Sequence, residues 1–148
     1  MQPKEFYFDK TIIIDDSEVD RYIARFFIET CNFSKQIVEF EMAHNAIQYL
    51  ENYSGSIHEK ALILLDIHMP VMNGFEFLER MEEFLQNAKD NFSVVMLSSS
   101  FDIYDLRRAE QNPLIKKFVV KPLNESSLEE IKKCLALREE KEIVQSKL

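Results

Sequence analysis

The segment Ala61-Leu62-Ile63-Leu64-Leu65-Asp66 decides the fold of this chain, because an unbroken apolar run ends directly in an acid. Three other apolar runs end in the same way: residues 11–14 lead into Asp15 and Asp16, residues 94–97 into Ser98 and Ser99, and residues 118–120 into Lys121 and Pro122. Short continuous apolar runs are typical of strands buried on both faces, as in parallel sheets. The carboxyl ends of parallel strands share one edge, where ligands bind. We therefore expect these polar residues to gather in one crevice.

Strand-like and helix-like segments alternate along the rest of the chain. The alternating pattern of residues 36–41 predicts a further strand, at an edge of the sheet. Ser17, with Asp20 three residues on, has the spacing of a helix N-cap. Helices are predicted after Ser17, over residues 43–53, 75–88 and 102–111, and from residue 125; strands are predicted over 92–97 and 117–120, and a loop at 54–56. This alternation predicts an α/β fold in which a doubly wound, five-stranded parallel sheet carries helices on both faces.

Composition excludes several classes of protein. A chain of 148 residues suits one domain. The net charge of −8 argues against a nucleic-acid partner, because such binding relies on basic residues. No apolar stretch approaches the roughly 20 residues of a membrane span, and the start of the chain lacks a signal peptide's apolar segment. Cys31 and Cys134 show no metal-ligand spacing and suit reduced cysteines. We expect a cytoplasmic protein with no membrane partner.

The carboxylates of Asp15, Asp16 and Asp66 carry the predicted chemistry. Taken singly, each is as well explained as an ordinary loop residue or helix cap. Three carboxylates in one crevice repel each other unless a cation neutralises them, and Mg²⁺ favours such oxygen ligands. A carboxylate beside that ion can act as a nucleophile and form an aspartyl-phosphate, a reaction that needs mainly positioning and charge neutralisation. Lys121 and a serine hydroxyl are suitable donors to phosphoryl oxygens.

Four motifs carry a resemblance to a known family. They are Ile13-Ile14-Asp15-Asp16-Ser17, Leu64-Leu65-Asp66-Ile67-His68-Met69-Pro70-Val71-Met72-Asn73-Gly74, Leu97-Ser98-Ser99-Ser100 and Val119-Val120-Lys121-Pro122-Leu123. In this order, at four predicted strand ends, they resemble the receiver domain of response regulators in two-component signalling, of the stand-alone chemotaxis type. The resemblance implies a flavodoxin-like sheet of order 2-1-3-4-5 and a receiver domain over residues 9–137. Residues 1–8 are then an N-terminal extension and residues 138–148 a C-terminal helical extension.

The resemblance also implies a role for each site residue. Asp66 matches the phosphoacceptor, and Mg²⁺ is the implied cofactor. The implied metal ligands are Asp15, Asp16, Asp66 and the backbone carbonyl of His68. The implied switch and phosphate-binding residues are Ser98, Lys121 and Phe118, and the implied modulating residues are Ser99, Ser100 and Pro122, with the Lys121–Pro122 peptide cis in the family.

The histidine side chains are expected to have no role in the site, and two features of the chain differ from most members of the family. The imidazole of His68 is expected to face solvent, and His44 and His58 to lie on the surface. Phe118 replaces an aromatic residue that is often Tyr, so only apolar surface favours its burial. Residues 112–117 stand where many receivers have a Gly-Ala turn, which predicts a longer or differently shaped loop.

The expected function is that of a stand-alone response regulator. It accepts a phosphoryl group on Asp66 from a histidine kinase or phosphotransfer protein and signals to an unidentified protein through a phosphorylation-dependent surface. It is not an enzyme beyond its own phosphorylation and dephosphorylation. The alternative is a receiver-fold interaction module that is not phosphorylated, which the intact Asp, Ser and Lys set disfavours. An aspartate-nucleophile phosphatase is disfavoured because His68 stands where that class has a second acid, and a DNA-binding regulator because no second domain is predicted.

Overall fold

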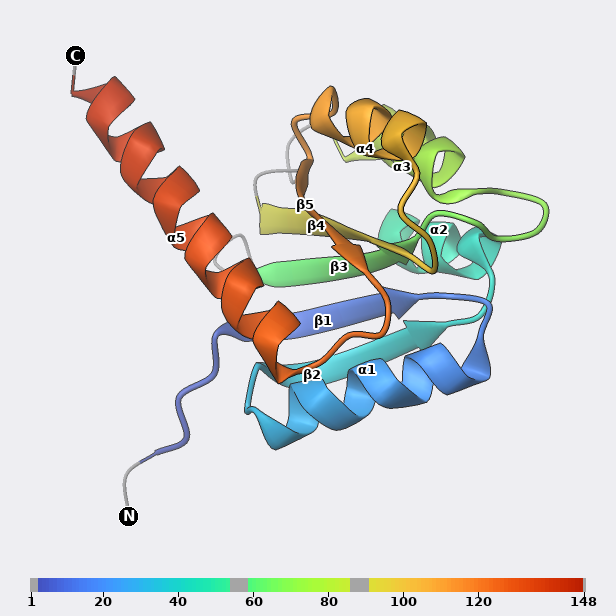
Figure 1. Cartoon of the computed structure of the whole chain (residues 1–148), viewed down its shortest axis with the longest axis horizontal. Helices are drawn as coiled ribbons and strands as arrows, with labels where there is room; N and C mark the ends of the chain where they lie inside the picture. Colours follow the sequence, from blue (N-terminus) through green and yellow to red (C-terminus); the bar gives the residue numbers. More distant parts are fainter. Residues whose placement is uncertain (1–2, 54–58, 86–90, 148) are drawn as a thin grey trace.

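The computed structural model describes residues 3–53, 59–85 and 91–147. Five parallel strands form one sheet of order β2-β1-β3-β4-β5, and a helix follows each strand (Figure 1). The elements are β1 Phe8–Ile14, α1 Glu18–Thr30, β2 Ser34–Phe40, α2 Ala43–Glu51, β3 Ala61–Asp66, α3 Gly74–Phe84, β4 Phe92–Ser98, α4 Ile103–Glu110, β5 Ile115–Val120 and α5 Glu125–Ser146. The predicted fold class, strand order and edge position of β2 are confirmed.

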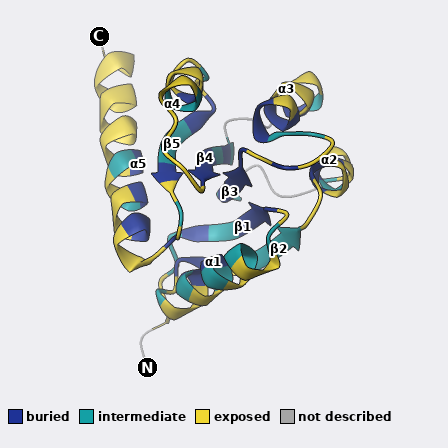
Figure 2. Cartoon of the chain, turned by 45° about the vertical axis from the view of Figure 1, so that its right-hand side comes forward, coloured by how far each residue is buried: buried dark blue, intermediate teal, exposed yellow. Residues whose placement is uncertain are grey.

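The apolar run of β3 is explained by helices on both faces of the sheet (Figure 2). Successive side chains of a strand point to opposite faces. Leu62 and Leu64 pack in a core with α1 and α5. Ile63 and Leu65 pack in a second core with α2, α3 and α4. Every residue of β3 is buried, Asp66 included, so the strand carries its terminal acid into the interior.

Most predicted element boundaries lie within a few residues of the observed ones, but one loop prediction is wrong. The loop predicted through residue 117 ends earlier, because Ile115 is buried and pairs with Val94 of β4. Strand β5 therefore begins at Ile115, two residues before the predicted start at Lys117. Helix α2 ends before the predicted residue 53, at Glu51. The loop at 54–56, His58 and the predicted helical residues 86–88 lie outside the described residues.

Helix α5 is a single helix that continues past the body of the sheet (Figure 1). Its first half packs on the sheet through the buried Leu128, Ile131 and Leu135. Further along, Glu139 lies 3.6 Å from the ammonium of Lys60, which ties the second half to the start of β3. In the described part of the chain, no helix is both long and apolar enough to cross a membrane.

Candidate functional site

The three predicted acids lie together at the carboxyl edge of the sheet. Strands β1 and β3 are neighbours with Ile14 opposite Leu65, so Asp15 and Asp66 follow the paired positions of adjacent strands. Asp15, Asp16 and Asp66 each place one carboxylate oxygen within 4.8 Å of the others. Asp15 and Asp66 are buried, whereas Asp16 is exposed. The crevice therefore has two carboxylates at its base and one at its mouth.

Lys121 supplies the positive charge of this crevice. Its ammonium lies 2.7 Å from Asp15 Oδ2 and 3.4 Å from Asp66 Oδ1. A third carboxylate, Asp20 Oδ2 on α1, accepts a hydrogen bond from the same ammonium at 2.9 Å. Sequence reasoning missed this contact, because it noted Asp20 only for its spacing from Ser17. No local signal identifies a partner that is 101 residues away in the chain.

The electrostatics of the crevice are dominated by the excess of carboxylates. Burial raises the pKa of Asp66 to about 7, and the negative charges of Asp15 and Asp16 add to the effect while Lys121 opposes it. Burial disfavours the charged form of Lys121, but hydrogen bonds to Asp15 and Asp20 outweigh it, so the pKa of Lys121 is raised. One ammonium cannot balance these acids. Clustered carboxylate oxygens are ligands that suit Mg²⁺, so the residues present fit that ion.

Ser98 ends the neighbouring strand β4, and its hydroxyl is engaged within its own loop. The buried Ser98 Oγ donates a hydrogen bond to the Ser100 carbonyl at 2.7 Å and accepts one from the Ser100 N–H at 3.3 Å. The Ser98 carbonyl accepts from the Lys121 N–H at 2.8 Å, which joins the ends of β4 and β5. Ser99 and Ser100 are exposed. The Lys121–Pro122 peptide is cis.

The side chains of His68 and Phe118 both lie on the α4 side of the site. The side chain of His68 is 61% exposed, and its Nε2 lies 3.2 Å from Asp105 Oδ2 of α4. Its imidazole is therefore directed toward α4, while its backbone carbonyl stays a candidate metal ligand only by resemblance. Phe118 of β5 is half-buried against the core beneath α4. It borders a hollow of about 370 Å³ together with Leu106 and Cys134. Among the other histidines, His44 is exposed.

Gly74 sets the position of the Asp66 main chain. A Cβ at Gly74 would lie 2.6 Å from the Asp66 carbonyl oxygen, closer than side-chain carbons come to backbone atoms, and a tight 3.1 Å from Ile67 Cα. The Gly74 N–H also donates to the Ile67 carbonyl at 2.8 Å. A glycine at the start of α3 thus lets this helix pack directly on the end of β3.

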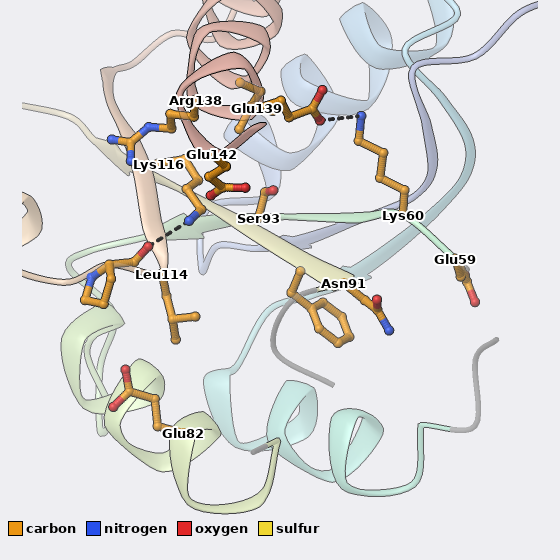
Figure 3. Close-up of a pocket in the computed structure, with 13 residues that line it drawn as sticks. Glu59, Lys60, Glu82, Asn91, Ser93, Leu114, Lys116, Arg138, Glu139 and Glu142 are labelled. Atoms are coloured by element: carbon orange, nitrogen blue, oxygen red, sulfur yellow. Dashed lines mark hydrogen bonds and ion pairs between the residues drawn. The ribbon is translucent and has the colours of Figure 1, made fainter. Parts of the chain in front are cut away.

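A separate hollow of about 500 Å³ lies at the opposite, amino edge of the sheet (Figure 3). It is bordered by the first residues of β4 and the second half of α5, with the Lys60–Glu139 ion pair on one side. Lys116 is on another side, where its ammonium donates to the Pro113 carbonyl at 2.9 Å. None of the predicted site residues borders this hollow.

Comparison with known proteins identifies the family. The family model of the response regulator receiver domain matches residues 11–133. The chain therefore belongs to the response regulator receiver domain family, whose general role is to accept a phosphoryl group and whose members bind Mg²⁺ at an acidic pocket.

Individual relatives agree with this assignment. The crystal structure of a two component response regulator from Cytophaga hutchinsonii has a TM-score of 0.79 at 27% identity and covers 87% of this chain and 98% of its own. That of a response regulator receiver protein from Dyadobacter fermentans has a TM-score of 0.72 at 30% identity, with coverages of 85% and 97%. A two-component response regulator of Oryza sativa subsp. indica is 27% identical over 128 residues, which are 84% of this chain. The chain spans only about half of that protein, 54% of its length.

Proposed function

We propose that this protein accepts a phosphoryl group on Asp66 from a histidine kinase or a histidine phosphotransfer protein. The observation that carries the proposal is the setting of Asp66. Its buried carboxylate ends β3 within 4.8 Å of the Asp15 and Asp16 carboxylates and 3.4 Å from the Lys121 ammonium. A nucleophilic carboxylate beside a cation site and a lysine is the arrangement that phosphoryl transfer needs. Residues 9–137 are the proposed phosphoaccepting module.

The proposed step exchanges one bond to phosphorus for another. An Asp66 carboxylate oxygen attacks the phosphorus of a phosphohistidine, the P–O bond forms as the P–N bond breaks, and the imidazole nitrogen keeps the electron pair. Asp15, Asp16, Asp66 and the His68 carbonyl would hold Mg²⁺, which would supply neutralising charge for the transfer. Lys121 donates to one phosphoryl oxygen. Ser98 turns its hydroxyl away from the Ser100 carbonyl and donates to another phosphoryl oxygen.

The proposed signal begins with that turn of Ser98. In the unphosphorylated structure, the Ser98 hydroxyl restrains the loop after β4 by donating a hydrogen bond of 2.7 Å to the Ser100 carbonyl. When the hydroxyl changes partner, the loop that leads into α4 is released. Phe118 borders the hollow of about 370 Å³ beneath α4 and can shift within it. The surface formed by α4, β5 and α5 then changes, and a downstream protein that binds one form better shifts the population toward it. In this proposal the protein acts as a regulator in the cytoplasm.

The test is labelling by a small radiolabelled phosphodonor, such as acetyl phosphate, with Mg²⁺. We expect labelling of the wild type and none of Asp66→Asn, which keeps the shape of the side chain but cannot form the acyl phosphate. Glu18→Gln is the matched control, because Glu18 is an exposed acid on α1 and its substitution should leave labelling intact. Equal labelling of Asp66→Asn and wild type would overturn the proposal. A wild type that takes no label would favour a phosphorylation-independent interaction module.

A further inference from the structure

The carboxylate of Asp20 is diverted from the contact that its position on α1 normally provides. Ser17 is the N-cap of α1, and its Oγ accepts from the Asp20 N–H at 3.2 Å. At this spacing a Glu or Gln side chain closes the capping box by accepting from the N-cap N–H, a role open to the Asp20 carboxylate as well. Here the Ser17 N–H donates instead to Asp15 Oδ1 at 2.9 Å. The Asp20 carboxylate is thereby left without that partner.

Helix α3 of the same chain shows the ordinary arrangement. Asn73 Oδ1 accepts from the Glu76 N–H, and Glu76 Oε2 accepts from the Asn73 N–H, each at 3.0 Å. Both hydrogen bonds of the capping box are therefore present in α3. The difference between the two helix starts is the buried Asp15, which takes the N-cap N–H of α1. Asp20 is then free to reach across to Lys121 at 2.9 Å.

Lys121 has no donor to spare while Asp20 is bound. A lysine ammonium has three N–H donors, and three carboxylates lie around this one. The distances are 2.7 Å to Asp15, 2.9 Å to Asp20 and 3.4 Å to Asp66. The longest of the three is the contact with the proposed phosphoacceptor. A phosphoryl group on Asp66 that draws this ammonium closer must therefore weaken its shorter contacts with Asp15 and Asp20.

We propose that Asp20 is a positioning residue that holds Lys121 toward α1 in the unphosphorylated protein and so lowers the affinity of the site for a phosphoryl group. This inference rests on the proposed function, because it concerns the same lysine. The side chain of Asp20 is 31% exposed, so water can solvate its carboxylate once Lys121 leaves. Asp20 contributes only its backbone N–H to the cap, so a side-chain substitution leaves the start of α1 in place.

The test compares Asp20→Asn with Glu18→Gln at limiting acetyl phosphate and fixed Mg²⁺. Both variants remove one negative charge from the first turn of α1, but of these two acids only Asp20 contacts Lys121. We expect Asp20→Asn to be labelled about fivefold faster than wild type, the equivalent of roughly 1 kcal/mol for a partly exposed ion pair. Glu18→Gln should stay within about twofold, since an exposed charge without a partner acts weakly.

Three further measurements separate positioning from a general effect of charge or stability. In a Lys121→Met background, where labelling is slow but measured at high donor concentration, Asp20→Asn should have no effect. Asp20→Glu, which restores the carboxylate, should return the rate toward that of wild type. In the metal-free protein, the side-chain ¹³Cε resonance of Lys121 should shift in Asp20→Asn and not in Glu18→Gln, which reports the lost contact independently of phosphorylation.

The outcomes distinguish this inference from the proposed function. If wild type is labelled on Asp66 and Asp20→Asn behaves like Glu18→Gln, Asp20 has no positioning role and only this inference fails. An Asp20→Asn effect that persists in the Lys121→Met background also overturns it. Labelling that survives in Asp66→Asn removes the proposed function itself.

Discussion

Two nearly buried lysines, at opposite edges of the sheet, have different surroundings. The side chains of Lys121 and Lys10 are 10% and 12% exposed. Lys121, at the carboxyl edge, has carboxylates as its neighbours. Lys10, near the start of β1, lies 3.3 Å from Glu59, donates to the Tyr49 hydroxyl at 2.9 Å and sits 4.8 Å from the centre of the Tyr53 ring.

The difference lies in the balance of charge. One carboxylate and two aromatic rings balance the positive charge of Lys10, so this lysine needs no ligand. The crevice around Lys121 holds more negative than positive charge, and the raised pKa of Asp66 is the result. A buried lysine with a balanced partner is therefore structural, whereas one that leaves carboxylates uncompensated marks a site that needs a further cation or a proton.

The largest effect is expected from Lys121→Met. Labelling of Asp66 should fall about a hundredfold, because a preorganised donor to the phosphoryl group is lost. Mg²⁺ affinity should instead rise about tenfold, because a positive charge next to the cation site has gone. Isothermal titration calorimetry measures the second effect. Weaker Mg²⁺ binding in this variant would contradict the view that Lys121 and the metal share the same carboxylates.

The second prediction concerns the pH dependence of stability in the metal-free protein. The folded pKa of Asp66, about 7, lies above the unfolded value of about 3.9. Between these values the folded state keeps a proton that the unfolded state has lost. The free energy of unfolding should therefore decrease as pH rises from 4 to above 7, by at most about 1.4 kcal/mol per pH unit from this group.

Urea unfolding at a series of pH values, with chelator present, measures this slope. Asp66→Asn should flatten it, since the titrating group is removed, and saturating Mg²⁺ should do the same for wild type. The same slope in Asp66→Asn would show that another group is responsible.

The smallest effect is expected from Lys10→Met at the amino edge. The variant loses a hydrogen bond, a largely buried ion pair and its cation–π contacts but keeps the apolar stem, so the free energy of unfolding should fall by about 1 kcal/mol. Mg²⁺ affinity and labelling should match those of wild type. A marked change in either would show that the two edges of the sheet are coupled.

Much of the fold was predictable because the strands are unusually clear in the sequence. The run from Ala61 to Asp66 has a single polar residue, at its end, and the structure buries all of it. The first two residues of β5 were not predicted to be strand, because Pro113 before Ile115 and the two lysines after it are typical of a loop. Strand β5 begins at Ile115 because this residue is buried and pairs with Val94, and both contacts form only in the assembled sheet.

The site was predictable to the extent that strand ends define it. Asp15, Asp66 and Lys121 each follow an apolar run, and the parallel sheet brings them to one edge. Asp20 follows no strand, and its contact depends on Asp15 having taken the N–H of Ser17. The hydrogen bonds of the Ser98 hydroxyl were likewise beyond prediction, because they depend on one rotamer and one loop conformation.

The close approach of Gly74 to Asp66 has a consequence for how strain can travel through the molecule. On one side of the phosphoacceptor, α3 rests on the main chain with no intervening side chain, 2.6 Å from the place where a Cβ would be. The backbone on that side is therefore rigid and cannot yield. On the other side, the loop after β4 is restrained at Ser98 by a hydroxyl that can turn. We expect displacement at Asp66 to be blocked toward α3 and to travel toward α4.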